Sequence, residues 1–256
     1  MKLKSQILLA ILATSSAAFA QTAPAAPEVP EVTYNVGVVS QYRYRGIAQT
    51  KGDAALQGGV DYANANGFYL GAWGSTIKWI KEAGSGASPA VDAKGAVELD
   101  VYGGYKFEAA GVAYDVGYLR YEYVNNTYNK TGGVNANTDE VYGAATYGVF
   151  TAKYSYAFSD LFGTANSKGS AYVDLSATLD LGEGYSLVPH VGHQKVSNTP
   201  NASYTDFALT VNKDLGDGLS ASLAAISTNA KNVDAFTINN YNTAKNAVIV
   251  GVKYAF

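Results

Sequence analysis

The chain has 256 residues, of which 48% are hydrophobic and only 15% are charged, and its formal net charge is −3. This balance offers no basic surface for nucleic acid, and the lack of cysteine excludes disulfides, thiolate metal sites and cysteine nucleophiles. After the N-terminus no stretch approaches the roughly 18 consecutive apolar residues of a spanning helix, which excludes a polytopic helical membrane protein.

The first 20 residues have the pattern of a secretory signal peptide. Lys2 and Lys4 supply positive charge, an apolar run covers residues 7–13, and Ala18 and Ala20 form an A-x-A cleavage site. An uncleaved membrane anchor is the alternative, but the apolar run is too short for roughly 30 Å of hydrocarbon. We therefore expect cleavage after this segment and export through the inner membrane.

Residues 21–31 form a proline-rich leader, which we expect to lie in the periplasm because proline cannot join the centre of a sheet. An exported chain without cysteine is typical of bacteria rather than of eukaryotic secretion. From residue 32 to residue 256 apolar side chains recur at every second position, which is the period of a β-strand. These patterns divide the chain into a signal peptide (1–20), a leader (21–31) and one all-β domain (32–256).

The β domain divides into twelve segments separated by turns and loops. The segments cover about 32–44, 54–63, 68–78, 96–107, 112–123, 140–147, 150–158, 170–181, 185–196, 204–213, 219–227 and 246–256. Five short turns alternate strictly with six long polar loops, as in an up-and-down outer-membrane barrel. Because hydrocarbon cannot pair backbone N–H and C=O groups, a membrane-spanning sheet must close on itself. The sequence therefore predicts a transmembrane antiparallel β-barrel of twelve strands.

Segment 170–181 shows the two faces of such a strand. Val173 and Leu175 are expected to meet lipid, and Tyr172 and Asp174 to face the lumen. A secreted sandwich or ligand-binding barrel would alternate in the same way, with its apolar residues in a core. Tyrosines near the strand ends and glycines on the polar faces favour the membrane barrel, because aromatic girdles lie at both lipid boundaries.

The last segment carries a further signal. Gly251, Tyr254 and the terminal Phe256 resemble the C-terminal β-signal that the outer-membrane barrel assembly machinery reads, although Ile249 stands where a polar residue is usual. The resemblance implies that Tyr254 and Phe256 address the chain to that machinery. Both residues would also belong to a lipid-facing girdle, and the two roles are compatible.

Residues 36–76 carry a more specific resemblance. The motifs are Ser40, the aromatic-Arg pair Tyr42-Arg43, Arg45-Gly46-x-x-Gln49, Gln57-Gly58-Gly59-x-Asp61-Tyr62 and Gly71-x-Trp73-x-Ser75. This pattern is similar to the TorF family of porin-like proteins, a proteobacterial group long described only as having no known function. The resemblance implies a Gram-negative outer-membrane location and a porin-like role, without an established substrate.

Catalytic chemistry finds little support. The chain has two histidines, His190 and His193, which face opposite ways on a strand, and neither has a serine two residues away. A serine hydrolase needs a base beside its nucleophile and a third group that orients the base. We expect no enzyme, no metal and no cofactor, and an outer-membrane lipid-modifying enzyme is the weakest alternative.

Charged residues on the polar faces are the candidate functional residues. The candidates for the lumen or its constriction are Arg43, Arg45, Asp61, Glu98, Asp100, Lys106, Lys153 and Asp174, with Lys253, Asp115, Glu140, Asp180 and Asp206 on the same faces. Arg43 is expected to pair with a carboxylate on a neighbouring strand, either as a constriction or as a structural ion pair. Trp79 is expected in the outer girdle, and the facing of Trp73 stays open.

The main functional hypothesis is a narrow channel for passive diffusion of small solutes, with a cation preference that follows from the excess of acidic lumen candidates. Twelve strands lie between the small barrels that side chains fill and the large ones that hold a water channel. A closed barrel that serves membrane structure or binds a partner therefore remains the alternative. The expected partners are outer-membrane lipids, the assembly machinery and small solutes.

Overall fold

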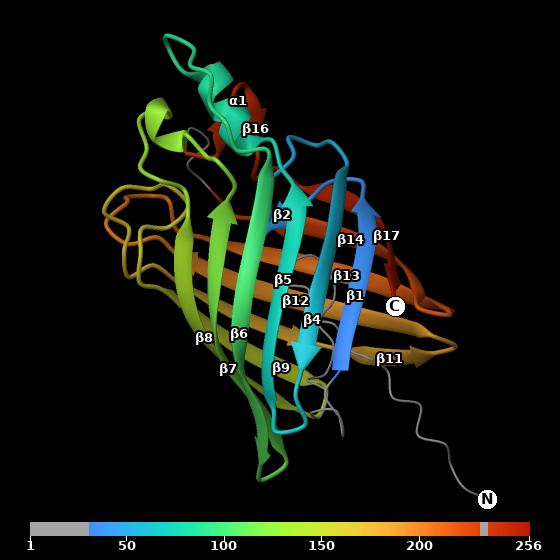
Figure 1. Ribbon diagram of the computed structural model, residues 1–256. Coiled ribbons are helices and arrows are strands. Elements are labelled where there is room, and N and C mark those ends of the chain that lie inside the picture. Colours follow the sequence, from blue (N-terminus) through green and yellow to red (C-terminus); the bar gives the residue numbers. More distant parts are fainter. Residues whose placement is uncertain (1–30, 231–234) are drawn as a thin grey trace, which may run out of the picture.

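The computed structural model describes residues 31–230 and 235–256. Within them the chain forms a closed antiparallel β-barrel of twelve wall strands (Figure 1). The strands are β1 (Glu31–Val39), β4 (Ala55–Ala63), β5 (Phe68–Thr76), β6 (Val97–Ala109), β7 (Val112–Tyr123), β8 (Thr138–Tyr147), β9 (Phe150–Ala157), β10 (Ala171–Ala177) continued by β11 (Leu179–Gly182), β12 (Tyr185–Lys195), β13 (Tyr204–Gly216), β14 (Leu219–Thr228) and β17 (Ala247–Ala255). The predicted fold class is confirmed. The predicted cleavage site at Ala18 and Ala20 lies outside the described residues.

The first and last strands close the barrel. Val36 of β1 pairs with Tyr254 of β17, and Tyr34 and Phe256 exchange backbone hydrogen bonds of 2.8 and 2.9 Å. Each wall strand pairs with its neighbours along the chain, and β10 and β11 both pair with β12, with a shift of register between Asp180 and Gly182. Because the sheet has no edge, every strand of the wall has backbone partners on both sides.

The two faces of the wall are as the period-two pattern predicts. Outward side chains such as Val36, Leu175 and Val250 are 43–54% exposed. Lumen side chains such as Tyr102 and Tyr172 are at most 3% exposed. A soluble barrel would show the reverse, because its apolar face would be the buried one. The outer surface is therefore suited to hydrocarbon.

Long loops gather at one end of the barrel, which we call the extracellular end, and short turns lie at the other (Figure 1). The long loops contain α1 (Trp79–Gly86), the 3-10 helix η1 (Tyr128–Thr131), β15 (Thr237–Ile238) and β16 (Tyr241–Asn242). In the described part of the chain no helix is long and apolar enough to cross a membrane. The prediction that Trp79 lies in the outer girdle was wrong. Trp79 is buried in α1, where its ring packs against those of Tyr123 and Tyr128.

The first strand is shorter than the sequence predicts. β1 ends at Val39, and the chain then turns into the barrel, where β2 (Arg43–Tyr44) and β3 (Ile47–Ala48) pair with each other. Tyr42 and Tyr44 have the same parity as the outward residues of β1, but they are 1% and 8% exposed inside the barrel. The prediction was wrong because β2 is also extended, so the alternation continues after the chain has left the wall.

Candidate functional site

Residues 41–50, which we call the inner hairpin, fill the extracellular half of the lumen. Arg43 is fully buried and Arg45 is 3% exposed. The two-residue turn at the tip consists of Arg45 and Gly46, both with positive φ, which is the backbone geometry that a tight hairpin requires. A Cβ on Gly46 would lie 2.7 Å from the side chains of both Asp206 and Thr228, so only glycine fits against that wall.

Arg45 reaches across the lumen to the opposite wall. Its guanidinium donates two hydrogen bonds to Glu140 of β8, at 2.9 and 2.7 Å, and one of 2.8 Å to Oε1 of Gln194 on β12. The guanidinium carbon also lies 4.8 Å from the centre of the Tyr44 ring and 4.4 Å from that of Tyr172. A bidentate pair of guanidinium and carboxylate is among the strong charge-assisted contacts, and the two rings add cation–π attraction.

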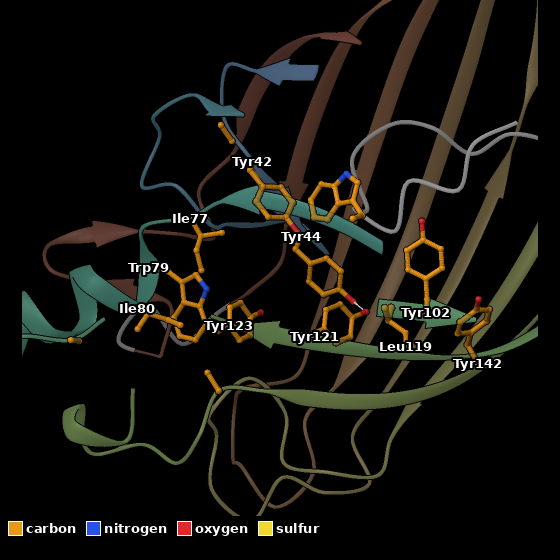
Figure 2. Close-up of a cluster of buried hydrophobic side chains, with 14 of the residues drawn as sticks. Tyr42, Tyr44, Ile77, Trp79, Ile80, Tyr102, Leu119, Tyr121, Tyr123 and Tyr142 are labelled. Atoms are coloured by element: carbon orange, nitrogen blue, oxygen red, sulfur yellow. Dashed lines mark hydrogen bonds between the residues drawn. The ribbon is translucent and has the colours of Figure 1, made fainter. Parts of the chain in front are cut away.

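Aromatic rings pack around the inner hairpin (Figure 2). The Tyr42 hydroxyl donates to Glu98 of β6 at 2.7 Å, and its ring meets Trp73 edge to face. The hydroxyls of Tyr44 and Tyr121 are hydrogen-bonded to each other. Trp73 is 3% exposed and faces the lumen, which settles the facing that the sequence left open.

Arg43 does not make the predicted ion pair. It donates to Oε1 of Gln41 and to the backbone oxygens of Gly46 and Thr243, at 2.6, 2.7 and 3.2 Å. These bonds tie the inner hairpin to itself and to the last extracellular loop. The expected pairing with a wall carboxylate is made by Arg45 instead, because the turn places Arg45 at the tip of the hairpin, near β8.

Tyrosine hydroxyls hold most of the lumen carboxylates. The pairs are Tyr42 with Glu98, Tyr69 with Asp115, Tyr102 with Asp61, Tyr121 with Glu140 and Tyr172 with Asp206, at 2.5–3.2 Å. A buried carboxylate needs such donors to offset its lost hydration. The sequence did not predict this role for most of these tyrosines, because a tyrosine that faces the lumen and one in a lipid-facing girdle cannot be distinguished by residue type.

The other predicted lumen residues lie on the inner face. Glu98 and Asp100 are 1% and 0% exposed near the extracellular end. Lys153 lies 3.9 Å from the centre of the Tyr142 ring, and Lys106 lies 5.1 Å from that of Tyr69. Asp174 accepts a 2.7 Å hydrogen bond from His190. In contrast, Asp180 is exposed and accepts a hydrogen bond from the Gly182 backbone in a turn.

The two histidines face opposite ways, as predicted. His190 is on the lumen face between Asp174 and Asp206, whereas His193 is exposed and contacts Thr205. The hydrogen-bond partners of the two rings within residues 31–230 and 235–256 are Tyr172, Asp174 and Thr205. Among residues 31–230 and 235–256, no group of three or more histidine, aspartate and glutamate side chains could hold a metal ion.

The two halves of the lumen differ in how tightly they are filled. Around the inner hairpin the wall residues Glu140, Gln194, Asp206 and Ile249 are at most 3% exposed. Towards the turns many inward side chains are polar and partly exposed; they include Asn35, Asp61, Lys106, Lys153, Ser176, Ser186, Asn212, Ser222 and Lys253. They lie among the buried side chains of Tyr69, Asp115 and Thr146.

Three extracellular loops are linked above the lumen. Lys51 and Asn239 both donate to Glu82 of α1, at 2.6 and 2.7 Å. The hydrogen bond from Lys51, followed by that from Asn239, lowers the pKa of Glu82 from its ordinary value. Because Lys51 directly follows the inner hairpin, this contact connects the hairpin to the surface loops.

The residues of the proposed assembly signal lie at the closing seam. Gly251 is buried, whereas Tyr254 and Phe256 point outward and are 45% and 65% exposed. Phe256 stacks on both Tyr34 and Tyr254, with ring centres 5.7 and 5.5 Å apart. Both aromatic residues thus belong to a band of outward rings near the turn end.

The barrel has the fold of outer-membrane porins. The KdgM porin aligns over 89% of this chain and 99% of its own, with a TM-score of 0.52 and 10% identity. KdgM in complex with disordered oligogalacturonate gives a TM-score of 0.53 at 9% identity over the same shares. The NanC porin covers 88% of this chain and 99% of its own, with a TM-score of 0.55 and 11% identity. At these identities the likeness concerns the fold alone.

The chain itself belongs to the Gcw_chp family, described as bacterial protein of unknown function, whose model matches residues 22–256. No curated protein matches the chain. The family description does not carry the name TorF, so that narrower resemblance stays a prediction. Neither the family description nor the names of the two porins indicate an enzyme.

Proposed function

We propose that this protein is a narrow channel in the outer membrane of a Gram-negative bacterium, through which small solutes diffuse passively. The observation that carries the proposal is the lumen itself. Below the inner hairpin its wall presents partly exposed polar and charged side chains of both signs, including Asp61, Lys106, Lys153 and Lys253. Water-filled porin channels have polar lumen walls of this kind. The porin-like fold supports the same function.

We propose further that the channel favours cations. Acidic side chains outnumber basic ones on the lumen faces, and tyrosine hydroxyls hold Glu98, Asp61 and Asp115 in place. An excess of negative over positive charge along a pore enriches cations in it. The extracellular half, where Glu98, Asp100 and Glu140 are buried, is where this selection would act.

Single-channel recording in planar bilayers tests the proposal. Purified protein should give small current steps, and a potassium chloride gradient should give a reversal potential of the sign that marks cation preference. Arg45→Ala should raise the conductance, because it removes the side chain that crosses the lumen. A reversal potential of the opposite sign would contradict the cation preference but not the proposed channel.

A closed barrel that serves membrane structure or binds a partner is the second candidate. The observation that favours it is the inner hairpin, in which every residue except Ile47 is at most 9% exposed. Single-channel recording separates the two candidates. If wild-type and Arg45→Ala proteins both show no current above the lipid background, the channel is excluded and the closed barrel is favoured.

We also propose that the terminal Phe256 directs the chain to the barrel assembly machinery. Deletion of Phe256 should reduce the amount of assembled, heat-modifiable barrel in outer-membrane fractions severalfold. Val252→Ala, on the same outward face of β17, serves as the control for lost apolar surface and should assemble normally. Equal amounts of assembled barrel from the deletion and from wild type would show that Phe256 is only a girdle residue.

A further inference from the structure

The guanidinium of Arg45 occupies a site that is built like a receptor for an organic cation. Glu140 offers a carboxylate that accepts two hydrogen bonds, Gln194 offers an amide oxygen, and Tyr44 and Tyr172 offer two aromatic faces. Glu140 and Gln194 are each only 2% exposed. Carboxylate, amide oxygen and aromatic faces together are the groups that bind guanidinium and ammonium ions.

Most of this site belongs to the wall and not to the inner hairpin. Glu140, Tyr172 and Gln194 lie on β8, β10 and β12, which hold their positions through the closed sheet. Tyr121 of β7 donates a further hydrogen bond of 3.2 Å to Glu140. If the hairpin withdrew, a buried carboxylate would remain, aimed into the lumen and in need of a cation.

We propose that Glu140, Gln194 and Tyr172 form a binding site for the guanidinium or ammonium group of a small organic cation, and that Arg45 fills this site until a solute replaces it. The inference rests on the proposed channel function and names its substrate class. One guanidinium takes the place of another, so every contact that the exchange breaks at the wall is made again. A cationic solute would restore the counter-charge of Glu140, whereas a neutral solute would leave Glu140 unpaired.

The wall below the site offers similar contacts for the next step of a passing cation. Lys153 lies 3.9 Å from the centre of the Tyr142 ring, in a part of the lumen that also holds Asp115 and Asp174. Here again one of the chain's own cations lies over a tyrosine ring. Arg45 over Tyr172 and Lys153 over Tyr142 are thus two contacts of the same kind in the lumen.

Uptake of two matched solutes by proteoliposomes tests the inference on the wild-type protein. L-arginine and L-citrulline have nearly the same shape, but citrulline carries a neutral urea group in place of the guanidinium. Arginine should enter severalfold faster than citrulline, and Glu140→Gln should bring the ratio close to one. Equal rates in the wild type would overturn the inference and leave the channel standing. Entry of neither solute would overturn the channel and the inference with it.

A second experiment measures binding of the guanidinium ion independently of transport. Arg45→Ala should be less stable than wild type, and millimolar guanidinium chloride should raise its Tm above the value in equal sodium chloride. The double variant Arg45→Ala/Glu140→Gln is the matched control and should show no such rise, because the carboxylate that holds the guanidinium is gone. An equal Tm of Arg45→Ala in the two salts would contradict the site.

Discussion

Glu140→Gln is expected to lower the free energy of unfolding by about 3 kcal/mol, because it leaves the buried guanidinium of Arg45 without its counter-charge. The substitution keeps the size and shape of the side chain, so that packing against Tyr121 is preserved. The measurement is urea unfolding of the folded barrel in lipid vesicles, followed by the fluorescence of Trp73 and Trp79, both of which are buried.

The control for this prediction removes both charges. Arg45→Met combined with Glu140→Leu should recover most of the stability that Glu140→Gln loses, since apolar residues of similar volume replace a buried ion pair with little net cost. If the double variant is as unstable as Glu140→Gln, the loss comes from packing and not from an unpaired charge. The result would then deny that the ion pair holds the inner hairpin.

Leu175→Arg is expected to destabilise the barrel by about 2–4 kcal/mol, because it places a charge in hydrocarbon near the middle of the strand formed by β10 and β11. Leu175 is 49% exposed on the outer face. The same urea titration in vesicles measures the effect. A value within experimental error of wild type would mean that this face does not meet lipid.

Ser176→Arg provides the matched comparison for Leu175→Arg. Ser176 is the next residue of β10, and its side chain is on the lumen face, opposite His190 in the register with β12. A charge there lies on the partly exposed lumen face, two residues from Asp174, and the loss of stability should be smaller. An equal loss of stability for both variants would show that a charge costs the same free energy on the outer face as on the lumen face.

The strand pattern was predictable residue by residue because a barrel wall has two different solvents. Lipid on one side and a polar lumen on the other impose a period of two. The face of Val173, Asp174 and Leu175 can therefore be predicted from residue type. Loop and turn composition then placed the strand ends close to where the structure has them. No such solvent contrast acts on residues 40–54, where the predicted first strand continued too far.

The ion pair of Arg45 with Glu140 could not be predicted, because the period-two pattern does not give the path of residues 41–50 inside the barrel. Arg43 and Arg45 share one parity in the sequence, but the turn at Arg45 and Gly46 places only Arg45 against β8. Its partners Glu140 and Gln194 are 95 and 149 residues away along the chain. Gly46, at the tip of the inner hairpin, was the available signal of a turn at this point.

The sequence by itself determined the closed β-barrel, its twelve wall strands and the inner and outer faces, because these follow from local periodicity and from the need to pair every backbone group in lipid. Only the tertiary structure decided that residues 41–50 enter the lumen, that Trp73 and Tyr42 meet there, and that Arg45 binds Glu140. These contacts join strands far apart in the chain, and their geometry exists only once the barrel has closed.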